Sequence, residues 1–223
     1  MVEVGIIPIL TVSSGFNVRD VIVEIKIDFI IQELVDLPLE FGVFYVRFPS
    51  ERNGFVNSIT MKEFLAVEGD GVKTLQQLIL EKDRASLQWE TLKEVYRNKL
   101  DVILDKGKRM ELVSIGNHCL GTKFLDGNHL INEKLTASFD RISKQVNGFY
   151  FGRYDLRCAS LADLENGKIK IMELNGCGAE PAHIYHPGAS LVKAMKVLIT
   201  HWKNMYRISV ENQVKLIFSI LLL

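Results

Sequence analysis

The residues of this chain best suited to chemistry lie between positions 149 and 187. Two segments here read as strands, residues 149–157 and 168–174, and the Asn166-Gly167 pair between them is a strong signal for a tight turn. Successive side chains of a strand point to opposite faces, so every second residue shares a face. One face would therefore carry a polar set: Arg153, Asp155 and Arg157 from the first strand, and Glu173 and Asn175 from the end of the second.

This polar set suits a metal ion bound together with a phosphorylated ligand, provided that both strands present it to the same side. Two carboxylates and a carboxamide offer the oxygen ligands that hard divalent cations prefer. Arginine guanidinium groups match the geometry of phosphate. The alternative is an ordinary hairpin whose charged face is exposed to solvent.

The same residues resemble the magnesium signature of the ATP-grasp ligases. In that family an Asp on one strand is followed by Glu-x-Asn at the end of a later strand, and an Arg often stands two residues before the Asp. Here the matching segments read FGRYDLR (151–157), ELNG (173–176) and EPAHIYHP (180–187). Together they are similar to a bacterial branch described as D-alanine–D-alanine ligase-like.

The resemblance implies an ATP-dependent carboxylate–amine ligase that forms an acyl phosphate and uses ATP with one or two magnesium ions. Its substrates would be a small carboxylate and an amine, such as an amino acid or peptide. Arg153 would stabilise charge on the transferred phosphoryl group. The implied magnesium ligands are Asp155, Glu173 and Asn175. The residues implied to face the acceptor substrate are Gly176, Glu180 and His183.

An earlier segment carries features that the resemblance assigns to adenosine. Residues 28–35 read as a buried apolar strand with a polar end, and Glu40 lies seven positions after Glu33. In the family, the backbone and a Glu or Gln of a hinge bind adenine, and a carboxylate seven residues later binds the ribose hydroxyls. An edge strand with exposed acids is the alternative. The implied nucleotide-binding residues are Gln32, Glu33, Leu34, Val35, Glu40 and Asn117.

A glycine-punctuated segment, GNHCLGTKF at 116–124, follows a short strand expected at 112–115. Such a loop can present hydrogen-bond donors to phosphate or carboxylate, and the family branch has a similar Gly-Asn-His-x-x-Gly-Thr segment. His118 and Lys123 are therefore candidate catalytic residues beside Arg153. A structural role with satisfied hydrogen bonds is the alternative for His118.

The other elements are expected to build the scaffold. Residues 42–48 and 54–60 read as a hairpin. Asp70 stands in a Gly-Asp-Gly loop where a structural role is favoured, and Thr74 is a natural helix N-cap. Helical spacing predicts helices at 87–104, 133–146 and 190–206, with Trp89 and Tyr96 in the core. The final apolar run from 214 to 223 is too short for a membrane span.

Composition limits the classes of function. The chain has 223 residues with 27 basic and 27 acidic side chains, so no excess of positive charge points to nucleic acid. The three cysteines are scattered and odd in number, which favours reduced thiols over disulfides. We expect a cytoplasmic protein without a membrane partner, and a homodimer is one assembly open to it. The cysteines are Cys119, Cys158 and Cys177.

The expected fold is α+β: an ATP-grasp fold, mainly its carboxy-terminal subdomain, with an antiparallel sheet and flanking helices. Residues 1–31 would be a remnant of the central subdomain, 32–207 the nucleotide- and magnesium-binding subdomain, and 208–223 an apolar tail. Residues 1–27 show neither the strand lysine nor the glycine-rich loop of the family. We therefore expect an amino-terminally truncated ligase with little turnover alone. A catalytically incomplete fragment and a non-enzymatic scaffold are the alternatives.

Overall fold

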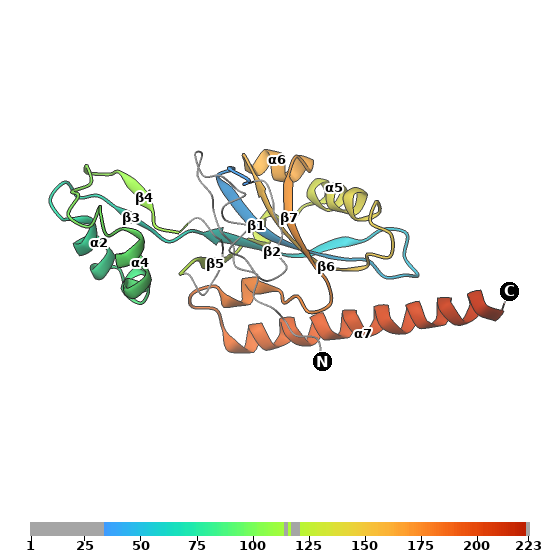
Figure 1. Cartoon of the computed structure of the whole chain (residues 1–223). Coiled ribbons are helices and arrows are strands. Elements are labelled where there is room, and N and C mark those ends of the chain that lie inside the picture. The colour runs from blue at the N-terminus through green and yellow to red at the C-terminus, as the bar shows by residue number, and fades with distance from the viewer. Residues whose placement is uncertain (1–33, 114–115, 117–120, 222–223) are drawn as a thin grey trace, which may run out of the picture. The chain divides into compact units, whose positions relative to one another are not determined.

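The computed structural model describes residues 34–113, 116 and 121–221, with side chains described as far as Val214 (Figure 1). The chain divides into two compact units, Met1–Asp36 and Leu37–Leu223. The fold described below is that of the second unit. Of the strand expected at 28–35, Leu34 and Val35 are described. They adopt no regular structure, and Leu34 is 65% exposed. Pro38 follows closely and has no N–H to give to a strand ladder, so pairing begins only at Leu39.

A five-stranded antiparallel sheet forms the centre of this unit. Its order is β5-β2-β1-β6-β7, and every neighbouring pair is antiparallel. The α+β class is therefore confirmed, and so is the hairpin expected from residues 42–60. The strands are β1 (Leu39–Val46), β2 (Phe55–Glu63), β5 (Lys123–Asp126), β6 (Phe151–Cys158) and β7 (Lys170–Asn175).

One face of the sheet is apolar and packs against two helices, α5 (Glu133–Ser143) and α6 (Leu161–Asn166), which lie side by side (Figure 1). The strands alternate, so Val43, Ile59 and Leu156 share this face and are fully buried. Asn132 caps α5 by accepting a hydrogen bond from the Leu135 backbone N–H at 2.9 Å. The helix expected at 133–146 is confirmed, although it ends three residues earlier.

The opposite face is apolar at one end and polar at the other. At the apolar end, Phe44, Val46 and Phe151 pack with Ala179 and with Ile208 of the long helix α7 (Leu191–Leu221). The helix expected at 190–206 is thus present but continues to Leu221, within the tail expected at 208–223. No described helix is long and apolar enough to cross a membrane. The polar end carries the candidate site.

The connection between β6 and β7 differs from the expected tight turn. Residues 161–166 form helix α6, with Ser160 as its N-cap, and Gly167 ends this helix in the left-handed conformation at φ 72°. A helix C-cap and a two-residue hairpin turn both favour glycine at positive φ, so Asn-Gly fits either structure. The two strands still pair antiparallel, but through a helical connection.

A smaller group of elements has its own core. It contains a two-stranded sheet and three short helices, and Leu75, Ile79 and Leu92 are buried within it. Thr74 caps its first helix in a capping box, and Asp70 accepts hydrogen bonds from the backbone N–H groups of Val72 and Lys73. Both structural roles are confirmed. The elements are β3 (Ala66–Glu68), α2 (Leu75–Glu81), α3 (Asp83–Ser86), α4 (Trp89–Val95) and β4 (Arg109–Glu111).

Two expectations for this group are wrong. The helix expected at 87–104 is reduced to α4, because Leu87 and Val95 are 82% and 64% exposed and give a longer helix no apolar face to bury. Trp89 and Tyr96 do pack against the core, as expected. Of the strand expected at 112–115, the described residues Leu112 and Val113 form no strand: β4 ends before them at Glu111, and Leu112 is a buried core residue.

Candidate metal and phosphate site

The polar faces of β6 and β7 coincide. Asp155 lies directly opposite Glu173 in the strand register, and Arg153 lies opposite Asn175. Directly opposed residues of an antiparallel pair project to the same face, with Cβ atoms about 4.5–5.5 Å apart. Alternation along the strands therefore predicted this juxtaposition correctly. The metal-binding role of the three oxygen-bearing side chains stays a prediction.

Asp155 is held by an arginine from its own strand. Arg153 donates from Nε to Asp155 Oδ1 at 2.9 Å and from Nη2 to Oδ2 at 3.0 Å, which is a bidentate pair. Asn175 Nδ2 also donates to Asp155 Oδ2, at 3.2 Å. Asp155 is only 6% exposed. Its carboxylate is thus buried, oriented and fully engaged by partners within the chain.

A second set of ion pairs lies on the same face, one row along the sheet. Glu40 of β1 is opposite Lys62 of β2 and Arg157 of β6. Its two oxygens accept from Lys62 Nζ at 2.9 Å and from Arg157 Nε at 2.8 Å. Lys62 Nζ also lies 3.8 Å from Asp155 Oδ1. The two sets therefore form one buried network of alternating charge.

Two glycines leave room for this network. A Cβ at Gly42 would lie 3.0 Å from the Arg153 Cδ and 3.2 Å from Asp155 Oδ1. A Cβ at Gly116 would lie 1.9 Å from Glu40 Oε1, which is far inside van der Waals contact. The first residue of the glycine-punctuated segment therefore approaches the Glu40–Lys62 pair through its backbone.

Lys62 and Lys123, the two lysines near residues 116–124, lie on opposite faces of the sheet. Lys123 is opposite Glu63 in the register and pairs with it at 2.9 Å, whereas Phe124 is opposite Lys62. Because neighbours alternate, Lys123 belongs to the sheet face opposite to that of Lys62 and Asp155. The expectation that Lys123 reaches this site is therefore corrected. The lysine of the site is Lys62, which sequence reasoning missed.

Several other predicted site residues lie in the first unit of the chain or outside the described residues. Gln32, Glu33, Asn117 and His118 lie outside the described residues, as does Cys119. Leu34 and Val35 belong to the first unit of the chain. Glu40 is placed within the candidate site, but its buried carboxylate already has two cationic partners and is 4% exposed.

The segment expected to face an acceptor substrate begins beside the network. Gly176 lies in open space, and Arg153 Nη1 donates to the backbone carbonyl of Glu180 at 3.0 Å. The Glu180 carboxylate accepts a 2.6 Å hydrogen bond from the Tyr185 hydroxyl. His183 lies in a short 3-10 helix, η3 (Ala182–Tyr185), which contacts β5 and β2. Burial lowers the pKa of His183, and nearby Asp126 partly opposes that shift.

The donor set fits magnesium in its chemistry. Two carboxylates and a carboxamide oxygen provide hard ligands, and several waters commonly complete the octahedral shell. Glu173 is exposed and forms no ion pair with any described residue, so it is available to a cation. No group of three or more His, Cys, Asp or Glu residues suited to a metal occurs in the described part of the chain. A metal here would rely on two carboxylates and on Asn175 turning its carbonyl oxygen inward.

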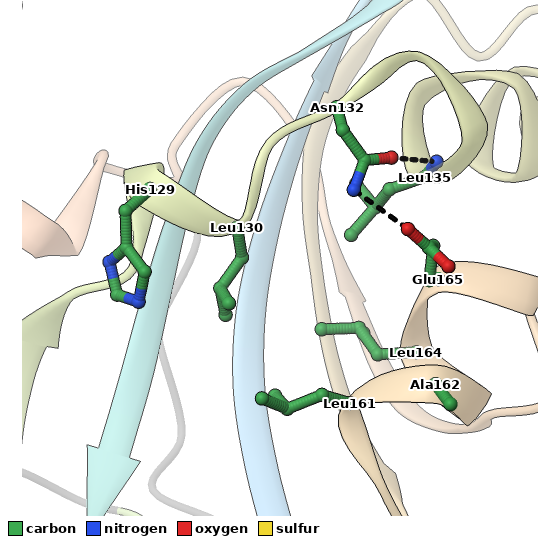
Figure 2. Close-up of a pocket in the computed structure, with 8 residues that line it drawn as sticks. All are labelled: His129, Leu130, Asn132, Leu135, Leu161, Ala162, Leu164 and Glu165. Carbon is green, nitrogen blue, oxygen red and sulfur yellow. Dashed lines mark hydrogen bonds between the residues drawn. The ribbon is translucent and has the colours of Figure 1, made fainter.

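A separate hollow lies between α5 and α6, on the apolar side of the sheet (Figure 2). Its volume is about 260 Å³. Asn132 accepts from the Leu135 N–H and donates to Glu165 at 2.8 Å, so its polar groups are already used in the fold. The carboxylates of the candidate metal and phosphate site, Glu40, Asp155 and Glu173, do not line it. The lining residues are His129, Leu130, Asn132, Leu135, Leu161, Ala162, Leu164 and Glu165.

No family model matches the chain, and no curated protein matches it. Among solved structures, the chain is similar to a bifunctional glutathione synthetase from Pasteurella multocida, with 17% sequence identity and a TM-score of 0.44. The match covers 75% of this chain and 24% of that enzyme, so it spans about a quarter of the enzyme's length. A likeness at this level carries no inference about activity.

Proposed function

We propose that this chain carries the magnesium- and phosphate-binding part of an ATP-grasp-type carboxylate–amine ligase. The observation that supports the proposal is the convergence of Arg153, Asp155, Glu173 and Asn175 on one sheet face, next to the buried cation Lys62. This combination provides oxygen ligands for a divalent cation and cations for a polyphosphate in one place.

The metal would be held by the β6–β7 pair. Asp155 and Glu173 would supply carboxylate oxygens, and Asn175 would supply a carboxamide oxygen from the adjacent row. Bound magnesium would supply charge neutralisation for the phosphates of ATP. The register fixes the spacing of the two carboxylates, because both belong to paired strands of the rigid sheet and not to a loop.

The phosphates would be bound by side chains that already sit beside those carboxylates. Arg153 is 20% exposed at its side chain, so it can reach a ligand above the sheet. Lys62 lies 3.8 Å from Asp155 and would add a second positive charge next to the metal. Preorganised cations in a partly buried site stabilise developing phosphoryl charge more than the same groups in water would.

The reaction would use these groups for positioning and charge stabilisation. A substrate carboxylate oxygen attacks the γ-phosphorus of ATP, and ADP leaves with the electron pair of the bridging oxygen. An amine then attacks the acyl carbon of the acyl phosphate, inorganic phosphate leaves, and the amine loses a proton. Arg153 and Lys62 would stabilise negative charge in the first step, which depends mostly on alignment.

The remaining contacts would come from the flanking segments. We assign adenosine to Gln32, Glu33, Leu34, Val35, Glu40 and Asn117, as the family resemblance implies. Glu40 would in addition fix Lys62 and Arg157, since it pairs with both. The acceptor would meet Gly176, Glu180 and His183, and His118 would contact a substrate or phosphate.

A non-enzymatic scaffold is the second candidate, and one observation favours it. Asp155 and Glu40 are each neutralised by cations of the chain itself, as they would be in a purely structural network. In that case the network would serve sheet pairing and the face would bind no nucleotide. Binding distinguishes the two candidates, and turnover distinguishes a complete ligase from a catalytically incomplete fragment.

The test is calorimetric titration with a non-hydrolysable ATP analogue, in magnesium and in EDTA. We expect magnesium-dependent binding to the parent chain and at least tenfold weaker binding to Asp155→Asn. Asp101→Asn is the matched control, because Asp101 is exposed and lies outside the site. Equal binding by both variants, or none by the parent chain, would refute the proposal.

A further inference from the structure

We propose that Arg153 switches partners when the ligands bind, so that metal and nucleotide occupy the site only as a strongly coupled pair. This inference rests on the proposed function. Without ligands, the Arg153 guanidinium neutralises Asp155. With both ligands bound, Asp155 would face the metal and Arg153 would face a phosphate.

The starting point is the bidentate contact between these two residues. Arg153 occupies both oxygens of Asp155, at 2.9 and 3.0 Å, and the pair is mostly buried, with side chains 20% and 8% exposed. A magnesium ion needs a free oxygen lone pair at about 2.0–2.1 Å. Metal binding at Asp155 therefore requires the guanidinium to move.

Metal alone is a poor replacement for that guanidinium. Displaced Arg153 would remain close to a divalent cation, with Lys62 Nζ also only 3.8 Å from Asp155 Oδ1. The carboxylates Asp155, Glu173 and Glu40 already balance the cations Arg153, Lys62 and Arg157, so a metal ion alone would add two uncompensated positive charges, which low dielectric makes expensive. Metal binding is consequently weak until an anion accompanies it.

Phosphate alone is equally poor. If Arg153 turned to a phosphate, Asp155 would keep only the distant Lys62 and the Asn175 amide as partners. A buried carboxylate that loses its cation is costly, and the phosphate would add negative charge beside it. Together, however, the metal satisfies Asp155 and the phosphate satisfies Arg153, so each ligand removes the penalty of the other.

The structure provides what such a switch needs. Gly42 is opposite Asp155 in the register and has no side chain next to Arg153; a Cβ there would lie 3.0 Å from the Arg153 Cδ. Glu173 is exposed and has no cation partner among the described residues, which makes it the first carboxylate a metal can meet. Arg153 Nη1 also donates to the Glu180 carbonyl at 3.0 Å. Its movement would therefore release the backbone of Glu180, one of the residues proposed to face the acceptor substrate.

Three titrations on the full chain test the switch: magnesium alone, the non-hydrolysable ATP analogue in EDTA, and the preformed magnesium complex. For the parent chain we expect the complex to bind at least tenfold more tightly than either component. For Arg153→Gln we expect magnesium alone to bind more tightly than to the parent chain, and the complex to lose most of its advantage. Arg141→Gln, an exposed change on α5, should match the parent chain.

The outcomes separate the switch from the proposed function. If Arg153→Gln binds magnesium alone no more tightly than the parent chain, while the parent chain still binds the complex, the switch is wrong and the proposed function stands. If neither the parent chain nor any variant binds the magnesium complex, both the switch and the proposed function are wrong. Circular dichroism of Arg153→Gln, together with Arg153→Lys as a charge-conserving variant, checks that a loss of binding is not a loss of fold. Arg153→Lys should keep weak coupling, since lysine retains the charge without the planar fork.

Discussion

Replacing Glu40 with glutamine tests whether the buried network holds the sheet together. Glu40 is 4% exposed, and its two oxygens pair with Lys62 at 2.9 Å and Arg157 at 2.8 Å. These partners come from β2 and β6, on either side of β1. The glutamine amide has almost the same shape as the carboxylate but carries no charge, so the substitution removes the negative charge of the side chain and keeps its volume.

The expected loss is large because Glu40 is the shared carboxylate partner of two buried cations, Lys62 and Arg157, and glutamine removes both of these ion pairs at once. Breaking a buried pair by removing one partner typically costs about 3–5 kcal/mol. That is a large fraction of the roughly 5–15 kcal/mol by which folded domains are stable. We therefore expect Glu40→Gln to unfold at a clearly lower urea concentration than the parent chain, measured by circular dichroism with global fitting of the transition.

Glu63→Gln is the matched control. Glu63 lies on the same strand as Lys62 and pairs with Lys123 at 2.9 Å, but these side chains are 45% and 35% exposed. Exposed pairs contribute about 0–1 kcal/mol, so this variant should stay close to the parent chain. If Glu40→Gln and Glu63→Gln lower the unfolding free energy equally, within about 0.5 kcal/mol, the reasoning is refuted, because a buried ion pair would then contribute no more than an exposed one. Adding Lys62→Met to Glu40→Gln should cost less than the sum of the two single changes, since the Lys62–Glu40 pair can be lost only once.

Three further predictions concern buried polar groups. His201 is 3% exposed and packs against the rings of Phe44 and Phe151. Burial lowers the pKa of His201, so near and below the ordinary value of 6.5 the unfolded chain binds more protons than the folded chain. Unfolding free energy should therefore fall as the pH drops below about 6.5, and His201→Phe should flatten that dependence in urea titrations from pH 7.5 to 5. Burial raises the pKa of Cys158 to about 11, so peptide mapping after iodoacetamide treatment at pH 8 should find Cys158 unmodified while the exposed Cys177 reacts. Tyr45→Phe removes a buried 2.6 Å hydrogen bond to Asp140 and should lower the unfolding free energy by about 1.5–3 kcal/mol, whereas a loss under 0.5 kcal/mol would contradict a charge-assisted bond.

The candidate site was predictable where it depended on strand alternation. The period of two along a strand is independent of the connection between strands, so Arg153, Asp155 and Glu173 were placed on one face although the connection itself was misread. Asn166-Gly167 signals positive φ, and both a hairpin turn and a helix C-cap meet that requirement. The residues before it decided the outcome, because Ser160 and Asp163 supply a helix N-cap.

Sequence reasoning missed the parts of the site that depend on pairing between distant segments. Glu40 and Arg157 are 117 positions apart, and only the β1–β6 register brings them together. Lys62 had a local signal, since a hairpin closed near residue 50 places β2 opposite β1. The glycine-rich surroundings of Lys123 favour it as a candidate, but the β2–β5 register places it on the other face. The strand face on which a lysine lies is therefore a better guide to its place in the site than its distance along the sequence from a motif.

A crystal structure of the chain with a non-hydrolysable ATP analogue and Mn²⁺ in place of magnesium would test directly whether the polar face of β6 and β7 binds metal and phosphate together. We predict an anomalous difference peak between Asp155 and Glu173, with a phosphate of the analogue against Arg153 and Lys62. Nucleotide bound with its metal at any other part of the chain, or a metal-free Asp155 still paired with Arg153 at saturating ligand, would contradict the account.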